Sequence, residues 1–94
     1  MYARPVMRYK EMRNYLKGKI AILKELNEKQ LRFNEIAKIT LLDSSILSSH
    51  IKFLRDRQLI NREYHYRKYY ITEKGKEVLT HLEKLEHFNM FSDV

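Results

Sequence analysis

Apolar residues recur every three or four positions along the N-terminal part of the chain, and this spacing predicts an amphipathic helix that begins soon after Pro5. Gly18 lies midway and costs about 1 kcal/mol in a helix interior relative to alanine. A kink or a break there would leave an N-terminal extension and a second helix over about Lys17–Glu28. The stripe stays near a repeat of roughly 3.5 residues, which favours pairing with another helix. It is formed by Tyr9, Met12, Leu16, Ile20, Leu23 and Leu26.

Two shorter helices are predicted in the middle of the chain. The segment NEKQLRF indicates a turn and a short extended stretch. A helix then follows over about Asn34–Ile39, with Asn34 as its N-cap. Ile36 and Ala37 are expected to face inward.

The next helix follows the turn TLLD, whose Leu42 is the expected core anchor. Asp43 or Ser44 is expected to cap this helix, because short polar side chains accept hydrogen bonds from a helix N-terminus. Spacings of four and three place three apolar residues on one face of this helix, and this face is expected to contact the core. The three residues are Leu47, Ile51 and Leu54.

The pattern changes to alternation in the stretch NREYHYRKYYI, residues Asn61–Ile71. Tyrosine and isoleucine favour strands, so the stretch predicts a hairpin that starts at Ile60. Since no Asn-Gly pair is present, the expected connection is a four-residue loop built on a type I turn near His65–Lys68. Thr72 is then expected to cap a last helix. The apolar side of that helix carries Val78, Leu79, Leu82, Leu85 and Phe88.

This order of elements predicts a mainly helical fold with a small β-hairpin, the winged helix-turn-helix. The segment SSILSSHIKFLRDRQLI resembles the recognition helix of MarR-like and PadR-like regulators. The segment YYITEKGKEVL resembles their wing-exit pattern, aromatic-x-Leu/Ile-Thr-x-x-Gly-x-x-x-Leu. The likeness extends to small, basic archaeal winged-helix DNA-binding proteins that pair through a terminal helix.

The resemblance covers about Lys17–Leu85 and implies three parts of one domain. These are a basic arm or helical extension over 1–16, the winged helix-turn-helix over 17–72 and a dimerisation helix with its tail over 73–94. Two positions depart from the pattern, since many relatives have glycine where Gln58 stands here and glycine or asparagine where Leu41 stands. A left-handed backbone there costs a residue with a side chain roughly 1 kcal/mol.

Charge is distributed unevenly along the chain. The net charge is +7, but residues 1–24 carry +6 and residues 52–76 carry +5, while residues 77–94 carry −3. Basic clusters of this kind indicate a polyanionic partner such as nucleic acid. The alternative interpretation is a solvated face that keeps the protein soluble.

Other classes of function find little support in the composition. The chain has no cysteine, so it offers no disulfide framework and no thiol nucleophile. We expect no cofactor and no enzyme activity, because no nucleophile–base pair, P-loop or glycine-rich phosphate cradle is present. No apolar run approaches the roughly 18 residues of a membrane span, and no signal peptide is evident. A cytoplasmic, nucleoid-associated protein is expected.

A metal site on the last helix is the weakest candidate. His81 and His87 each follow a glutamate by four residues, Glu77 and Glu83. Such pairs are ordinary on a helix surface, and metal-sensing sites normally use cysteine or denser histidine clusters. We therefore expect no metal.

The candidate DNA-binding residues fall into two groups. The polar face of the recognition helix carries small hydroxyls and cations that suit base edges and phosphates: Ser45, Ser48, Ser49, Lys52 and Arg55. The hairpin carries Arg62, Arg67 and Lys68, which suit phosphate contact, with Arg67 a candidate for the minor groove. Two alternatives remain for the hairpin. The cations protect an open sheet edge, or Tyr64, Tyr66, Tyr69 and Tyr70 stack on bases.

Both ends of the chain suggest self-association. The first segment is basic, the last is acidic, and each carries an apolar stripe, as expected of a dimer interface. The alternative is that both helices pack only within one subunit. We therefore predict a homodimeric, sequence-specific regulator of transcription that binds double-stranded DNA. The alternatives are an architectural binder with little sequence preference and a winged helix that binds a protein.

Overall fold

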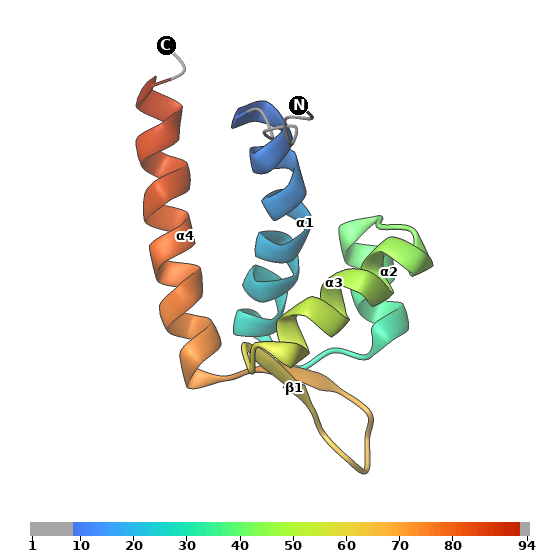
Figure 1. The fold of residues 1–94 in the computed structure, drawn as a ribbon. Coiled ribbons are helices and arrows are strands. Elements are labelled where there is room, and N and C mark those ends of the chain that lie inside the picture. The colour runs from blue at the N-terminus through green and yellow to red at the C-terminus, as the bar shows by residue number, and fades with distance from the viewer. Residues whose placement is uncertain (1–8, 93–94) are drawn as a thin grey trace, which may run out of the picture.

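The structure, a computed structural model, describes the backbone of residues 9–92 and the side chains of residues 16–85. This part of the chain forms four helices and one two-stranded antiparallel sheet (Figure 1). None of its helices combines the length and the apolar character that a membrane span needs. In chain order the elements are α1 (Tyr9–Glu28), α2 (Phe33–Thr40), α3 (Ser44–Asp56), β1 (Ile60–Arg62), β2 (Tyr69–Ile71) and α4 (Glu73–Ser92).

Helix α1 is the centre of the fold. Helices α2 and α3 pack on one side of it, and α4 runs back along the other side in the opposite direction (Figure 1). The chain does not break at Gly18, which lies within α1, so the predicted boundary between residues 16 and 17 falls inside a continuous helix. The first eight residues of the predicted basic arm, which was expected over residues 1–16, lie outside the described residues.

One core joins all of these elements. Each helix faces it with apolar residues at helical spacing, as the sequence pattern predicts, and burial of such a side chain contributes about 1.5–3 kcal/mol. The predicted inward positions Leu47, Ile51, Leu54 and Ile36 are all buried. Leu42 packs against the edge of the core, as expected of an anchor. The most deeply buried side chains are Ile22, Leu23, Leu31, Ile36, Leu47, Leu54 and Ile60.

The predicted N-cap of α2 is wrong. Helix α2 begins at Phe33, so Asn34 lies inside its first turn, and Arg32 takes the N-cap position. The reason is tertiary, because Leu31 exchanges two backbone hydrogen bonds with Tyr69, of 3.1 and 2.7 Å. The chain therefore leaves an extended conformation at Arg32, whose N–H donates to Glu35 Oε1 at 2.9 Å.

Two helix ends use left-handed residues that are not glycine, at the two positions where the sequence departs from the pattern that it resembles. Leu41 has φ 58°, and its N–H donates to the Ala37 carbonyl at 2.9 Å. Gln58 has φ 60° and ends α3, with hydrogen bonds from its own N–H to Arg55 and from Leu59 N–H to Leu54. That pair of bonds is a Schellman motif, in which glycine is the usual left-handed residue.

The hairpin, which we call the wing (residues 60–71), is short. Ile60 pairs with Ile71 and Arg62 with Tyr69 in its antiparallel register. A further backbone bond, from Glu63 N–H to the Lys68 carbonyl at 2.7 Å, encloses a four-residue loop. The loop length agrees with the prediction, but the loop is residues 64–67, one residue earlier than expected.

Thr72 precedes α4 and caps it, as predicted. Its Oγ1 accepts a hydrogen bond from Gly75 N–H at 3.0 Å, and its hydroxyl lies 2.7 Å from the Gln58 carbonyl oxygen. Farther along α4, Leu79 is buried, whereas Leu85 is 58% exposed although the pattern placed it on the apolar side. The side chain of Phe88 lies outside the described residues.

Gly75 lets α4 approach the wing closely. A Cβ at this position would lie 2.0 Å from the Leu59 carbonyl oxygen, a backbone atom that cannot turn away. We therefore expect Gly75→Ala to lower the free energy of unfolding by about 1–3 kcal/mol, as overpacked sites do. Urea denaturation measures this change. The control Lys74→Ala, exposed in the same turn, should stay within about 0.5 kcal/mol of the wild type; equal stability of the two variants would contradict the close approach.

Candidate nucleic-acid interface

The outward face of α3 carries all five residues that the sequence predicts for it. Ser45, Ser48, Ser49, Lys52 and Arg55 are exposed, opposite the buried apolar face. Ser45 is not free, because its hydroxyl donates to Asp43 Oδ2 at 2.6 Å. This bond lowers the pKa of the Asp43 carboxyl. Ser48, Ser49 and Lys52 thus form the accessible centre of the face.

A groove runs between α3 and the base of the wing, with a volume of about 870 Å³. We call it the wing groove. The predicted residues Ser48, Lys52 and Arg55 line its α3 wall. Asn61 and Lys74 line the opposite side, and two carboxylates, Asp56 and Glu73, also border it. A mixed wall of hydroxyl, amide and cationic groups suits the edge of a polyanion, while the carboxylates restrict where its phosphates can lie.

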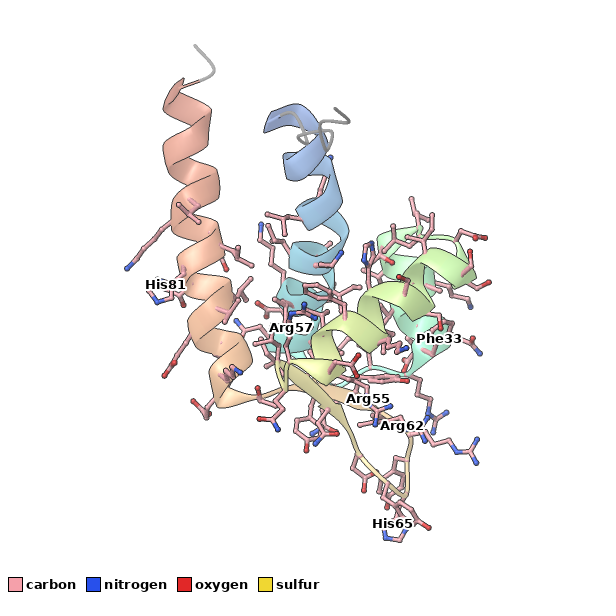
Figure 2. The ribbon with its side chains drawn as sticks, in the orientation of Figure 1. Phe33, Arg55, Arg57, Arg62, His65 and His81 are labelled. Atoms are coloured by element: carbon pink, nitrogen blue, oxygen red, sulfur yellow. The ribbon has the colours of Figure 1, made fainter. Side chains whose placement is uncertain are left out.

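The predicted wing cations do not join this groove. Arg62 and Arg67 are exposed and line a second hollow of about 500 Å³ between the wing and the start of α2, which we call the α2 cleft. Figure 2 shows Arg62 on this side of the wing and His65 at the far end of the loop. Lys68 is half-buried and lines neither hollow.

Sequence reasoning missed Arg32 and Asn34, which form the other wall of the α2 cleft. Arg32 places a third guanidinium beside those of the wing, at the N-terminal end of α2, where the helix dipole also favours an anion. The charge of Arg32 was visible in the sequence. Its position was not, because it depends on the pairing of Leu31 with Tyr69.

The four wing tyrosines separate into two kinds. Tyr69 is buried and Tyr70 half-buried, as expected of strand residues that pack on a core. Tyr64 and Tyr66, in contrast, are 87% and 66% exposed. The stacking interpretation is thereby limited to the loop.

A buried lysine connects α3 to α1. Lys19 is only 3% exposed, and its Nζ lies 3.0 Å from His50 Nδ1 and 4.8 Å from the centre of the Phe53 ring. The Arg57 guanidinium also stacks on this ring, at 3.5 Å. Burial, and secondarily the charge of Lys19, lower the pKa of His50. These contacts hold α3 against α1 and thus help to fix the direction of its polar face. The sequence pattern did not single them out.

The weakest candidate of the sequence analysis was a metal site at His81 and His87 of α4. Among the described residues, no three histidine, cysteine, aspartate or glutamate side chains come close enough to hold an ion. His81 lies exposed on α4 (Figure 2), and the side chain of His87 lies outside the described residues.

The sequence and fold are similar to those of known proteins. A family model described as winged helix-turn-helix matches residues 13–90. A possible HxlR family transcriptional factor from Thermoplasma volcanium GSS1 is 31% identical, with a TM-score of 0.66, and the alignment covers 87% of this chain and 81% of that chain. The reduced form of the transcriptional regulator YodB from B. subtilis is 22% identical, with a TM-score of 0.66 and coverage of 88% and 91%. HlyU from Vibrio cholerae N16961 is 23% identical, with a TM-score of 0.61 and coverage of 79% and 86%. No curated protein matches the sequence.

The environment of His50 predicts a pH dependence of stability. Because its pKa is lowered in the folded state, the unfolded chain binds more protons below the ordinary pKa of about 6.5. The stability that depends on neutral His50 is therefore complete above about pH 6.5 and is lost as the pH falls through the folded pKa. Thermal unfolding of His50→Gln between about pH 7.5 and pH 5 should show a weaker pH dependence than the wild type. The exposed His81→Gln should keep the wild-type slope, and an unchanged slope in His50→Gln would contradict this assignment.

Proposed function

The chain belongs to the winged helix-turn-helix family, and we propose that it is a regulator of transcription that binds double-stranded DNA in a sequence-specific manner as a homodimer. In this proposal α3 enters the major groove and the wing cations hold the phosphate backbone. The family confirms the resemblance predicted from the recognition-helix and wing-exit segments. The relatives described as transcriptional factors support the regulatory part of the proposal.

One observation carries the proposal: the polar face of α3 is open. Its serines and Lys52 are exposed, and no element of the described chain covers them. An isolated helix face of this width suits a B-DNA major groove, about 12 Å across. If another element of the chain covered this face of α3, the winged helix would be better explained as a protein-interaction module.

The division of cations supports distinct roles for α3 and the wing. Lys52 and Arg55 border the wing groove beside Ser48, whereas Arg62 and Arg67 border the α2 cleft on the other side of the wing. A helix in the major groove brings the first pair toward base edges. The second pair then lies toward the backbone, where contact gives affinity without sequence information.

Selection of bound sequences from a random pool of duplexes tests the proposal. Enrichment of one inverted repeat would support a dimeric regulator, because the two-fold symmetry of a dimer is mirrored in its site. Recovery of bound duplexes without a common sequence would indicate an architectural role. Recovery of no duplex at all would overturn DNA binding.

Substitutions separate reading of the sequence from holding of the backbone. Ser49→Ala and Lys52→Ala are expected to weaken binding to a selected site by about 1–3 kcal/mol where a base contact is lost, with less effect on a scrambled duplex. Arg62→Ala and Arg67→Ala are expected to weaken both duplexes alike and to lower the salt slope by about one unit per phosphate contact. Fluorescence anisotropy titrations from about 50 to 200 mM salt measure both effects. The opposite result would make the wing the reader of sequence.

The exposed end of the α4 stripe predicts a dimer. Leu85 lies in line with Val78 and Leu82, which pack on the core, but is itself exposed. Leu85→Glu should weaken dimerisation at least tenfold, since loss of a buried leucine contact is worth about 1.5–3 kcal/mol, and should weaken DNA binding with it. Sedimentation equilibrium measures the dimer, with the exposed Glu83→Gln as control. A Leu85→Glu protein with unaltered mass and DNA affinity would place the interface elsewhere.

A further inference from the structure

The tip of the wing presents aromatic side chains that the fold does not use. Tyr64, His65 and Tyr66 are consecutive and exposed, and Figure 2 shows His65 at the end of the loop, away from the helices. We call these three residues the wing tip. The rings of Tyr64 and His65 meet edge to face, with centroids 5.3 Å apart. None of the three belongs to the core.

The loop that carries the wing tip is held in place by two hydrogen bonds to Glu63. The Glu63 carboxylate accepts a hydrogen bond from Tyr66 N–H at 2.5 Å, and the Glu63 carbonyl accepts one from Arg67 N–H at 3.1 Å. The first of these bonds lowers the pKa of the Glu63 carboxyl. Arg67 adopts φ 56°, a left-handed conformation in which glycine is the usual residue. The rings are therefore presented outward by an organised loop, which reduces the entropy cost of using them in binding.

Protection of a sheet edge does not account for these rings. Edge protection uses charge, proline or bulges, and exposed aromatic rings have the opposite effect. The cations that lie beside the wing tip indicate the partner. His65 and Tyr66 border the α2 cleft together with Arg32, Arg62 and Arg67. Guanidinium groups next to exposed rings match a ligand that has both phosphates and flat bases.

The direction of the wing determines which part of a duplex the rings would meet. The wing projects away from the end of α3 (Figure 1), so with α3 in a major groove it extends toward the neighbouring minor groove. That groove is about 6 Å wide, which admits a loop tip or a ring but no helix. Apolar wedges inserted there unstack a base step, and pyrimidine–purine steps such as TA unstack most easily.

We propose that Tyr64 and Tyr66 enter the minor groove and wedge against a deformable pyrimidine–purine step. The wing tip then selects DNA by its deformability, at positions that α3 does not contact. This inference rests on the proposed DNA binding. It assigns to the wing a preference that its phosphate contacts alone would lack.

Composition-matched duplexes test the proposal without a known target sequence. One set contains TATA repeats, rich in TA steps, and the other contains the same bases with every adenine placed before every thymine, as in AAAATTTT, so that it has no TA step. Wild-type protein is expected to bind the TATA set about tenfold more tightly. The adenine analogue 2-aminopurine, placed after a thymine, should brighten severalfold on binding because its base is unstacked.

Variants assign the effect to the wing tip. The double variant Tyr64→Ala/Tyr66→Ala should lose both the preference and the fluorescence change while it keeps the salt slope of the wild type. Tyr64→Phe/Tyr66→Phe should keep both, because the wedge requires the ring. Arg67→Ala should lower the salt slope and keep the preference. Circular dichroism of each variant verifies that the fold is intact.

Each remaining outcome overturns a distinct statement. Equal binding of the two sets by the wild type, or a preference that survives in the double alanine variant, overturns the wedge and leaves DNA binding in place. One strand of each duplex is titrated in the same way. If the double alanine variant keeps wild-type binding to both duplex sets and loses only its binding to the single strands, the tip is a stacking platform for single strands, and the wedge is overturned. Failure of the wild type to bind any duplex overturns both the wedge and the proposed function.

Discussion

The arrangement of α3, the wing and α4 depends on the close approach of Thr72 and Gly75 to the backbone of Leu59, which we call the crossing. The Leu59 carbonyl accepts the Thr72 N–H at 3.0 Å, and the Thr72 hydroxyl lies 3.0 Å from the same oxygen. Leu59 N–H in turn closes the end of α3 through Leu54. Since Gly75 packs directly on Leu59, with no room for a Cβ, the end of α3, both ends of the wing and the start of α4 meet at one point. The direction of the wing relative to α3 follows from that meeting.

The crossing also explains why the cations form two groups. A wing that starts at the end of α3 leaves one groove on the α3 side and one cleft on the α2 side. The first receives Ser48, Lys52 and Arg55 from α3, and the second receives arginines from the wing and from the start of α2. Charge of the same sign thus lies in two surroundings. In the wing groove the cations stand among hydroxyl, amide and carboxylate groups, whereas in the α2 cleft guanidinium groups that suit phosphates lie together.

Backbone strain marks the connections around this surface. Leu41, Gln58 and Arg67 all have left-handed backbones without being glycine, at a cost of roughly 1 kcal/mol each. Each conformation is stabilised by neighbouring hydrogen bonds, most clearly at Gln58, where the Schellman motif also joins the buried side chains of Leu54 and Leu59. Glycine would remove the strain. It would also increase the conformational freedom of the unfolded chain, which offsets part of the gain.

Local pattern in the sequence was sufficient for the kinds of element and for the residues of α3 that face the core, although it placed the exposed Leu85 on the apolar side of α4. Helical spacing placed Leu47, Ile51 and Leu54 inward and left Ser48, Ser49 and Lys52 outward, because the period of a helix alone determines which side chains share a face. The cap at Thr72 followed from the same local chemistry, since a cap bonds to an amide only three residues away.

Long-range pairing decided what the pattern left open. The N-cap of α2 is Arg32 and not the predicted Asn34, because Leu31 pairs with Tyr69, which is distant in sequence. The same pairing placed Arg32 beside Arg62 and Arg67 and created the α2 cleft. Lys19 contacts His50 only because α3 packs on α1. Spacing in the sequence carries no information on contacts between residues of different elements, so these sites arose only when the core brought their elements together.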